Sequence, residues 1–413
     1  MSVVDLFDAA KTASSALARA NSNLKNSALE HIALELEGNM PHILKANAID
    51  LKNAVENDIA AGLQDRLRLD EKRIASLAKA VRLVIALPDP IGQSVDGMTL
   101  PNGLRLQQVR VPFGVVGVIY EARPNVTIDI AALALKSGNA VLLRGGSAAE
   151  NTNRVLVELI QAGLTKAGLP SQSVQTVDPY GRQGAVDMMQ ARGYIDVLIP
   201  RGSAKLIRTV VTESKVPVIE TGDGVVHMFI DESADIEKAI PMVVNAKVQR
   251  PSVCNALETL LVHQDIAASA LPKIAAALTE HGVTIHGCDR TLELVSAVAA
   301  TEADWETEYY SLDLAVKVVA DLDQALNHIA KYSTHHTESI ITENQSNAER
   351  FLQEVDSAVV MVNASTRFTD GGEFGFGAEV GISTQKLHAR GPMGLRELTS
   401  TKWLVRGNGQ VRD

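Results

Sequence analysis

Residues 115–147 read VVGVIYEARPNVTIDIAALALKSGNAVLLRGGS, and this stretch decides the fold class of the chain. Its first apolar run, 115–119, predicts a buried strand, and a helix is expected over about 129–137. A second apolar run at 140–143 predicts another strand, which ends in a turn with the sequence Arg-Gly-Gly-Ser. Two buried strands joined by a helix are typical of the βαβ unit of a parallel sheet.

The same alternation of strand, polar turn and helix continues along the chain. Further strands are expected at 174–177, 196–199 and 216–219, and a second series begins at 225–230 and returns at 359–362. A chain of 413 residues is also too long for one simple core. We therefore predict an α/β protein with two doubly wound α/β domains, one for a cofactor and one catalytic, plus a small β arm.

The predicted domain bounds follow from these patterns. The cofactor-binding domain is predicted at 1–94, which is helical, and at 113–224 and 364–396. The catalytic domain is predicted at 225–363, and the arm at 95–112 and 397–413.

The arm is predicted from two strand-like segments. Residues 104–111 alternate between apolar and polar side chains, which is typical of a half-exposed strand, and 401–405 also resembles a strand. Strands of this kind beside a domain can be shared between subunits, so we expect a homo-oligomer, either a dimer or a tetramer.

Composition excludes several classes of protein. The hydrophobic content of 46% and charged content of 21% are ordinary for a globular protein, and the formal net charge of −10 argues against nucleic acid as a partner. Two cysteines without a spacing pattern exclude a disulfide framework and a cysteine-based zinc site. We see no signal peptide and no apolar run near the ~20 residues of a membrane span. A cytoplasmic protein is expected, without metal or membrane.

Cys254 is the candidate nucleophile. It lies in the sequence Gln-Arg-Pro-Ser-Val-Cys-Asn, residues 249–255, between a helix and an apolar run that predicts a strand. Such a junction can present a reactive thiol rigidly. The alternative is that Cys254 is a small buried hydrophobic residue. Glu220 opens the turn Thr-Gly-Asp-Gly, and it is either a catalytic carboxylate or a cap of that turn.

Two turns are candidate phosphate sites. Arg144-Gly145-Gly146-Ser147 and Gly202-Ser203 follow predicted strands and open predicted helices, where backbone amides can meet a pyrophosphate. Neither a Gly-x-Gly-x-x-Gly fingerprint nor a P-loop is present.

These features together resemble the aldehyde dehydrogenase superfamily, over about residues 100–405. In that superfamily an asparagine follows an early strand, as Asn125 does here, a glutamate opens a glycine-containing turn, as Glu220 does, and the cysteine follows some thirty residues later. The resemblance is most specific in six stretches: 120–127 (YEARPNVT), 143–147 (LRGGS), 199–203 (IPRGS), 219–222 (IETG), 249–255 (QRPSVCN) and 368–377 (FTDGGEFGFG).

Those stretches resemble the branch that reduces L-glutamyl 5-phosphate to L-glutamate 5-semialdehyde in proline biosynthesis, with release of phosphate. The resemblance implies that Cys254 forms a thioester and that the Asn125 amide and the Cys254 backbone amide stabilise the oxyanion. Glu220 aligns with the general base of oxidising members. The alternative is another member, either CoA-acylating or hydrolytic, and a catalytically silent scaffold protein is a third reading.

The resemblance also implies the cofactor and its contacts. The superfamily commonly has Lys-Pro-Ser-Glu where this chain has residues 144–147, and the loss of that glutamate beside Arg144 favours NADP(H). Gly202 and Ser203 would lie at the pyrophosphate. Glu308 resembles the glutamate that holds the nicotinamide ribose, although a surface glutamate is an equal alternative.

The substrate would carry a carboxylate and an acyl phosphate, so its pocket needs cations. Arg123, Arg250 and Arg367 lie on the relevant loops and are the candidates. Functional coupling to glutamate 5-kinase is a further expectation from the resemblance. Cys288 has no convergent partners in the sequence and is expected to be structural.

Overall fold

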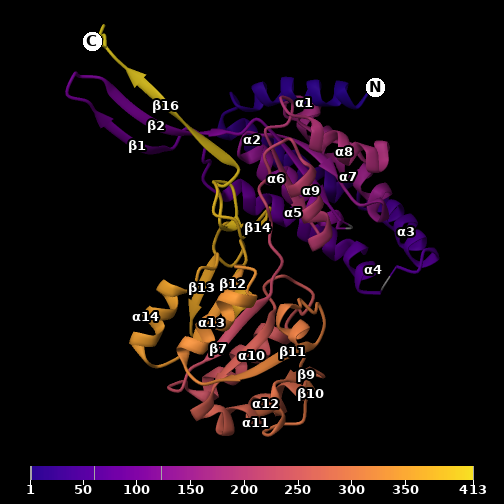
Figure 1. Cartoon of the computed structure of the whole chain (residues 1–413). Helices are drawn as coiled ribbons and strands as arrows, with labels where there is room; N and C mark the ends of the chain where they lie inside the picture. The colour runs from indigo at the N-terminus through magenta and orange to yellow at the C-terminus, as the bar shows by residue number, and fades with distance from the viewer. Residues whose placement is uncertain (1, 60, 122, 413) are drawn as a thin grey trace. The chain divides into compact units, whose positions relative to one another are not determined.

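The computed structural model describes residues 2–59, 61–121 and 123–412. It divides into two compact units (Figure 1). Unit 1 contains 1–220, 375–381 and 393–413, and unit 2 contains 221–374 and 382–392. Among the described residues, no helix is both long enough and apolar enough to cross a membrane.

Unit 1 begins with helices, as the sequence predicted. These are α1 (Val3–Leu17), α2 (Ser22–Gly38), α3 (Met40–Glu56), α4 (Ala61–Leu67) and α5 (Glu71–Ala86). The side chain of Asp70 accepts a hydrogen bond from the Arg73 backbone amide and caps α5, because the first amides of a helix lack partners within it.

A four-stranded parallel sheet forms the centre of unit 1, with the strand order β5-β4-β3-β6. Its strands are β3 (Val115–Tyr120), β4 (Ala140–Arg144), β5 (Val174–Thr176) and β6 (Val197–Arg201). All six residues of β3 are buried, because a central strand of a parallel sheet is covered on both faces. The connecting helices are α6 (Pro124–Lys136), α7 (Glu150–Lys166), α8 (Gly181–Gln190) and α9 (Ala204–Glu213).

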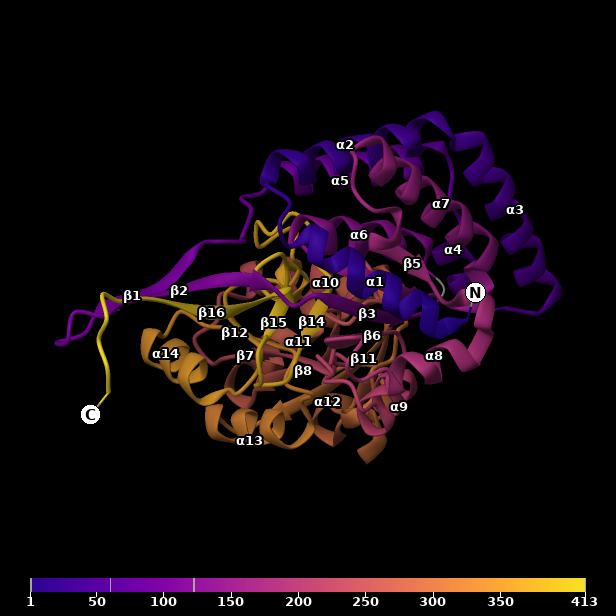
Figure 2. The ribbon, with the colours of Figure 1, turned by 90° about the horizontal axis from the view of Figure 1, so that it is seen from above.

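The helices of unit 1 pack in layers on this sheet. α1 contacts β3, β4 and β5 directly, whereas α6 and α7 contact the sheet and in turn carry α2, α3 and α5 (Figure 2). Short 3-10 turns complete the connections: η1 (Ser147–Ala149), η2 (Ser171–Ser173) and η3 (Asp178–Tyr180). The sheet is therefore held between helices and its strand ends are left for loops.

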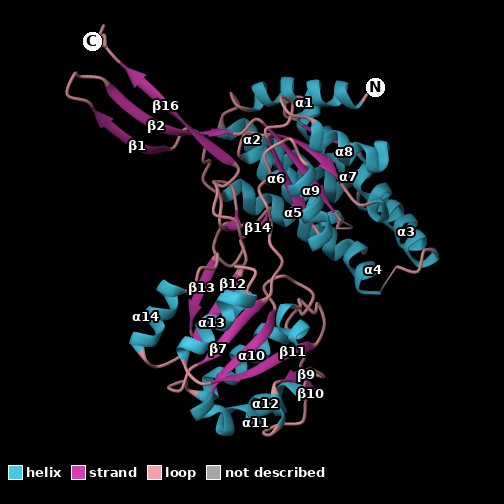
Figure 3. Ribbon diagram, viewed as in Figure 1, coloured by secondary structure: helices cyan, strands magenta, loops and turns pink. Residues whose placement is uncertain are grey.

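The predicted β arm is present as a separate antiparallel sheet with the order β1-β2-β16. Its strands are β1 (Ser94–Thr99), β2 (Arg105–Pro112) and β16 (Thr399–Arg406) (Figure 3). Val95, Met98, Trp403 and Val405 are exposed apolar side chains on this sheet. Exposed apolar side chains on edge strands favour pairing with another chain.

Unit 2 is built around a seven-stranded parallel sheet, with the order β10-β9-β11-β8-β7-β12-β13. Its strands are β7 (Val226–Ile230), β8 (Leu257–His263), β9 (Thr284–Gly287), β10 (Val298–Ala299), β11 (Asp313–Val319), β12 (Thr337–Ile341) and β13 (Val359–Val362). Its helices are α10 (Ile236–Val248), α11 (Gln264–Glu280), α12 (Asp289–Leu292), α13 (Leu322–Tyr332) and α14 (Gln345–Glu354), with 3-10 turns η4 (Glu302–Glu306) and η5 (Thr366–Phe368). The short strands β14 (Gly381–Ser383) and β15 (Gly391–Met393) pair where the chain passes between units.

The two faces of the seven-stranded sheet are covered by different helices. In β7, Met228 and Ile230 belong to a core with α10 and α11, whereas Phe229 belongs to a core with α13 and α14. Successive side chains of a strand point to opposite faces, so a continuous apolar run serves both cores. The prediction of doubly wound α/β domains is confirmed by this arrangement.

Three details differ from the sequence prediction. The strand expected at 216–219 is wrong, because only an isolated bridge between Val218 and Leu198 forms there. The helix expected from 129 begins at Pro124, since proline is well suited to the first helical position. Residues 221–224, 382–392 and 364–374 fall in unit 2 rather than with the segments predicted for the cofactor domain. Hydrogen bonds between residues 365–369 and the loop 249–255, which contains Cys254, hold the segment 364–374 in unit 2.

Candidate active site

Four neighbouring strands of unit 2 bring distant segments to one edge of its sheet. β11, β8, β7 and β12 are consecutive in the sheet and parallel, so their amino ends lie on the same side. The segments directly before them contain Glu308, Cys254, Gly224 and Thr334. The topology thus gathers residues separated by more than a hundred positions around one loop.

That loop, residues 249–255, is named the cysteine loop, and it connects α10 to β8. Cys254 is half-buried, so its thiol is neither sealed in the core nor fully exposed. Gly224 packs against its backbone: a Cβ atom added at Gly224 would lie 1.6 Å from the carbonyl oxygen of Cys254. Glycine is required at 224 because no other residue leaves the backbones room to approach.

Residues 365–369 brace the cysteine loop from the other side. The Asn255 side-chain amide donates to the carbonyl oxygen of Thr369 at 2.8 Å, and the Thr366 hydroxyl donates to the Asn255 carbonyl at 2.8 Å. The Arg367 Nε donates to the Gln249 side-chain oxygen at 2.7 Å. Side-chain bonds to backbone groups at both ends of a loop restrict its conformations.

Two predicted substrate residues, Arg250 and Arg367, share the surroundings of the thiol. Burial lowers the pKa of Arg367, while the charges of Cys254 and Asp370 favour its cationic form and Arg250 opposes it. Arg250 itself is exposed. The Arg367 guanidinium thus interacts with both the Cys254 thiol and Asp370, and guanidinium groups at such a place can attract anionic substrates.

Glu308 is a half-buried carboxylate at the same sheet edge. Burial raises its pKa to about 7; a hydrogen bond with Tyr310 opposes this rise, the charge of Asp223 adds to it, and the Gly224 backbone amide opposes it. Tyr310 has φ 57°, a left-handed conformation that is uncommon for a bulky residue. Strained residues of this kind are concentrated at functional sites.

Six of the predicted cofactor residues, 144–147 and 202–203, lie in unit 1 at the carboxyl ends of parallel strands, whereas Glu308 lies in unit 2. The turn from Arg144 to Ser147 follows β4, and Gly202 and Ser203 follow β6 and precede α9. The Gly145 amide donates to an oxygen of Asp178 at 2.7 Å, and burial raises the pKa of Asp178 to about 6. Ligands of α/β sheets bind at this edge, beyond the carboxyl ends of the strands.

The amino end of α9 already holds an anionic oxygen. The Glu121 carboxylate accepts hydrogen bonds from the Ser203 amide at 3.0 Å and from the Ser203 hydroxyl at 2.8 Å. A Cβ atom added at Gly202 would lie 2.7 Å from that carboxyl group. Backbone amides at a helix terminus favour anions, so this end of α9 stays a candidate phosphate site.

The remaining predicted residues lie along the same edge or at the end of unit 1. Asn125, on the first turn of α6, is exposed and its amide donates to Asp129 at 3.3 Å. Arg123 is the residue before α6. Glu220 is half-buried and is the last residue before the chain enters unit 2.

Sequence reasoning missed four residues of this region. Gly224 and Tyr310 gave no signal, because their importance depends on close packing and on a backbone angle. Lys247 and Glu258 form a buried pair, with the lysine nitrogen 2.6 Å from a glutamate oxygen. Here a signal existed, since a charge in the apolar run that forms β8 is unusual.

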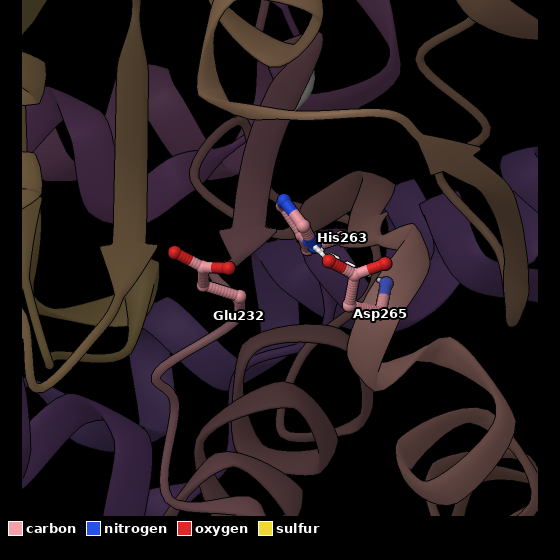
Figure 4. A group of neighbouring side chains, drawn as sticks. All are labelled: Glu232, His263 and Asp265. Carbon is pink, nitrogen blue, oxygen red and sulfur yellow. Dashed lines mark hydrogen bonds and ion pairs between the residues drawn. The ribbon is translucent and has the colours of Figure 1, made fainter.

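One further group of possible metal ligands lies at the opposite edge of the unit 2 sheet. Glu232, His263 and Asp265 each offer a ligand atom within 4.8 Å of the others (Figure 4). However, His263 Nδ1 accepts the Asp265 backbone amide at 3.2 Å and serves as the N-cap of α11, and both carboxylates are exposed. This group is explained as a helix cap.

The fold and the cysteine loop define a class of protein, and comparison with known sequences gives the same class. The sequence profile described as "Aldehyde dehydrogenase family" matches residues 67–311. The chain belongs to the aldehyde dehydrogenase family, and the predicted fold class is confirmed. An acetylating aldehyde dehydrogenase from Geobacillus thermoglucosidasius, 17% identical, shares the fold with a TM-score of 0.75 over 100% of this chain and 97% of that one.

Within this family, the chain is most usefully compared with proteins named gamma-glutamyl phosphate reductase. That of Clavibacter michiganensis subsp. michiganensis is 62% identical over 98% of this chain and 94% of its own length. That of Leifsonia xyli subsp. xyli is 62% identical over 100% and 98%. The crystal structure of the Thermotoga maritima protein of that name is 50% identical and superposes with a TM-score of 0.97, covering 100% of both chains.

Family membership implies a nicotinamide cofactor, and the residues of unit 1 fit such a group. At the amino end of α9, the Ser203 amide donates a hydrogen bond to a carboxylate oxygen of Glu121. Among the described residues, Arg144 Nε and one oxygen of Asp178 are buried atoms without a hydrogen-bond partner. Unsatisfied polar atoms beside a glycine turn are expected where a polar ligand completes the site.

Proposed function

We propose that this chain reduces L-glutamyl 5-phosphate to L-glutamate 5-semialdehyde with NADPH, releasing phosphate, as the second step of proline biosynthesis from glutamate. The observation that carries the proposal is the half-buried Cys254, which packs against Gly224, is braced through Asn255 and interacts with Arg367. Identity of 62% over nearly the whole chain to relatives named gamma-glutamyl phosphate reductase supports the choice of substrate.

Cys254 supplies the nucleophile. Its thiolate attacks the acyl carbon, the carbon–oxygen bond to phosphate breaks, and a thioester forms on the sulfur. A bound reduced nicotinamide supplies the hydride for this thioester. The tetrahedral species then expels the Cys254 thiolate, and the aldehyde is released. Sulfur suits both steps because it is a strong nucleophile and a good leaving group.

The oxyanion that develops in each step needs hydrogen-bond donors. The proposed donors are the Asn125 side-chain amide and the Cys254 backbone amide, whose orientation the brace at Asn255 restricts. Removal of one such donor typically lowers the rate by about 10²–10³. Glu220 is proposed to assist deprotonation of the thiol, because a reductase has no hydrolytic water to activate.

Arginines are proposed to hold the anionic groups of the substrate. Arg367 interacts with the thiol of Cys254 and Arg250 lies near Arg367 in unit 2, so a phosphate or carboxylate there would pair with two guanidinium groups. Arg123 is the third candidate, at the start of α6 in unit 1. The phosphate released when the thioester forms is an anion, and the same arginine side chains would stabilise it.

The cofactor is proposed to be NADP(H), bound by unit 1. Arg144 to Ser147 would receive the adenine ribose and its 2′-phosphate, and Gly202 and Ser203 would receive the pyrophosphate. The cationic Arg144 with its partnerless Nε supports this choice. Glu308 is proposed to contact the nicotinamide ribose from unit 2. On this reading unit 1 is the cofactor-binding domain and unit 2 the catalytic domain.

The arm formed by β1, β2 and β16 is proposed to join subunits into a dimer or tetramer. Its exposed apolar side chains, Trp403 and Val405 among them, support an interface there. The enzyme is further proposed to work in the cytoplasm and to be functionally coupled to glutamate 5-kinase, which makes the labile acyl phosphate.

The proposal is tested by following NADPH oxidation with enzymatically generated glutamyl phosphate. Wild type should turn over, Cys254→Ala should lose essentially all activity, and Cys288→Ala, which removes the other half-buried thiol, should keep it. Phosphate-dependent oxidation of the semialdehyde by wild type should occur in the reverse direction. Near-normal turnover by Cys254→Ala, or CoA dependence in place of phosphate dependence, would contradict the proposal.

A further inference from the structure

Two buried charges flank the cysteine loop, and the proposed chemistry uses neither. Lys247 is the penultimate residue of α10, and Glu258 is the second residue of β8, so they lie on the two stems of the loop. Their side chains are fully buried and joined by a hydrogen bond of 2.6 Å. The pair thus links the end of the helix directly to the start of the strand.

Stability alone does not explain this pair. Burial raises the pKa of Glu258 to about 8 and lowers that of Lys247, so the interior disfavours both charges despite their contact. Replacing a buried ion pair with apolar residues of similar volume is often neutral or stabilising. Where such a pair is retained, a role in fixing one particular arrangement is a well-documented alternative.

The surroundings connect the pair to Cys254 from a second direction. The Lys247 nitrogen lies 5.7 Å from the centre of the Tyr309 ring, and Glu308 and Asp313 place carboxylates near the ammonium group. The Tyr309 backbone amide interacts with the Glu258 carboxylate.

The neighbouring Glu308 meets the amide of Gly224, and Gly224 packs on the Cys254 carbonyl. The segment 308–309 therefore contacts both the pair and the residue that supports Cys254. A shift of the pair would be transmitted to the cysteine loop at its stems and beneath Cys254.

We propose that Lys247 and Glu258 are positioning residues for Cys254. They fix the distance between the two stems of the cysteine loop and so hold the sulfur and the backbone amide of Cys254 in one orientation. This inference rests on the proposed role of Cys254 as the nucleophile, but it does not depend on which acyl substrate the enzyme takes.

The test removes both charges together in Lys247→Met/Glu258→Leu. We expect a free energy of unfolding equal to or above that of wild type, measured by urea unfolding. The rate of Cys254 alkylation by iodoacetamide should fall about tenfold or more, its pH profile should shift, and kcat should fall by about 10–100-fold. KM for the dinucleotide should change less than kcat, because six of the seven proposed cofactor residues, 144–147 and 202–203, lie in the other unit.

The matched control is the exposed pair Lys273 and Glu237, which joins α11 to α10 with a distance of 2.8 Å. Lys273→Met/Glu237→Leu should leave alkylation and kcat unchanged, because exposed pairs contribute little. Wild-type alkylation and kcat in the buried double variant would overturn the proposal. If that variant does not fold, Glu258→Gln replaces it: a several-fold slower alkylation supports positioning, and an unchanged rate contradicts it.

The design separates this inference from the proposed function. If wild type fails to reduce glutamyl phosphate but Cys254 alkylation still depends on the buried pair, the substrate is wrong and the positioning role stands. If wild type reduces glutamyl phosphate and the buried double variant does so equally well, the positioning role is wrong and the proposed function stands.

Discussion

Gly224→Ala gives a sharp test of the site because the structure specifies what the new methyl group would meet. Its Cβ would lie 1.6 Å from the carbonyl oxygen of Cys254 and 2.5 Å from the carbonyl carbon. Real contacts of a Cβ atom essentially never fall below 3.0 Å, so the difference, 3.0 − 1.6 = 1.4 Å, is the smallest shift that relieves the overlap. Both partners are backbone, so no side chain can rotate away.

The expected consequence is a large loss of activity with a modest loss of stability. Misplacing a catalytic group by about 1 Å costs about 10² in rate, so kcat/KM should fall at least about 100-fold. Overpacking of this kind costs about 1–3 kcal/mol in the free energy of unfolding, which leaves the protein folded. The assays are NADPH oxidation, iodoacetamide labelling of Cys254 and urea unfolding.

Two glycines provide controls. At Gly38 an added Cβ meets nothing within 4 Å and φ is not in the left-handed region, so Gly38→Ala should be neutral or slightly stabilising. At Gly222 the added atom meets the Thr384 side chain, 2.1 Å away, so Gly222→Ala should disturb packing without touching the Cys254 backbone directly. Wild-type kcat/KM and labelling in Gly224→Ala would refute the reasoning about the cysteine loop.

Two other predictions concern acid stability and cofactor affinity. His336 is fully buried and burial lowers its pKa to about 4, from an ordinary 6.5. Below about pH 6.5, His336 binds a proton in the unfolded chain but not in the folded chain. The free energy of unfolding should therefore decrease by about 3 kcal/mol in total as the pH drops from 6.5 to 4, and then level off. In His336→Gln, the decrease in the free energy of unfolding between pH 7 and pH 4, measured by urea unfolding, should be smaller by that amount. An unchanged pH dependence would contradict the role given to His336. Arg144→Ala should weaken binding of NADPH, measured by calorimetry, about tenfold or more, with a smaller effect on NADH; equal effects on both would count against a 2′-phosphate contact.

Much of the architecture was accessible from patterns of apolar residues. The buried strands at 115–119, 140–143 and 257–262 form β3, β4 and the main part of β8, because a run that is apolar on both faces suits a parallel sheet. The strand expected at 216–219 failed because its apolar residues meet β6 only through an isolated bridge. Local pattern indicates burial, but only neighbouring strands determine whether a ladder forms.

The sequence by itself determined the fold class, the identity of the candidate nucleophile and its place between a helix and a strand. Only the tertiary structure decided what surrounds Cys254: the close approach of Gly224, the brace from 365–369, and the buried pair of Lys247 and Glu258. The physical reason is the parallel sheet, whose neighbouring strands bring segments far apart in the chain to a common edge. Periodicity along a sequence reports which residues are buried, whereas strand order fixes which of them meet.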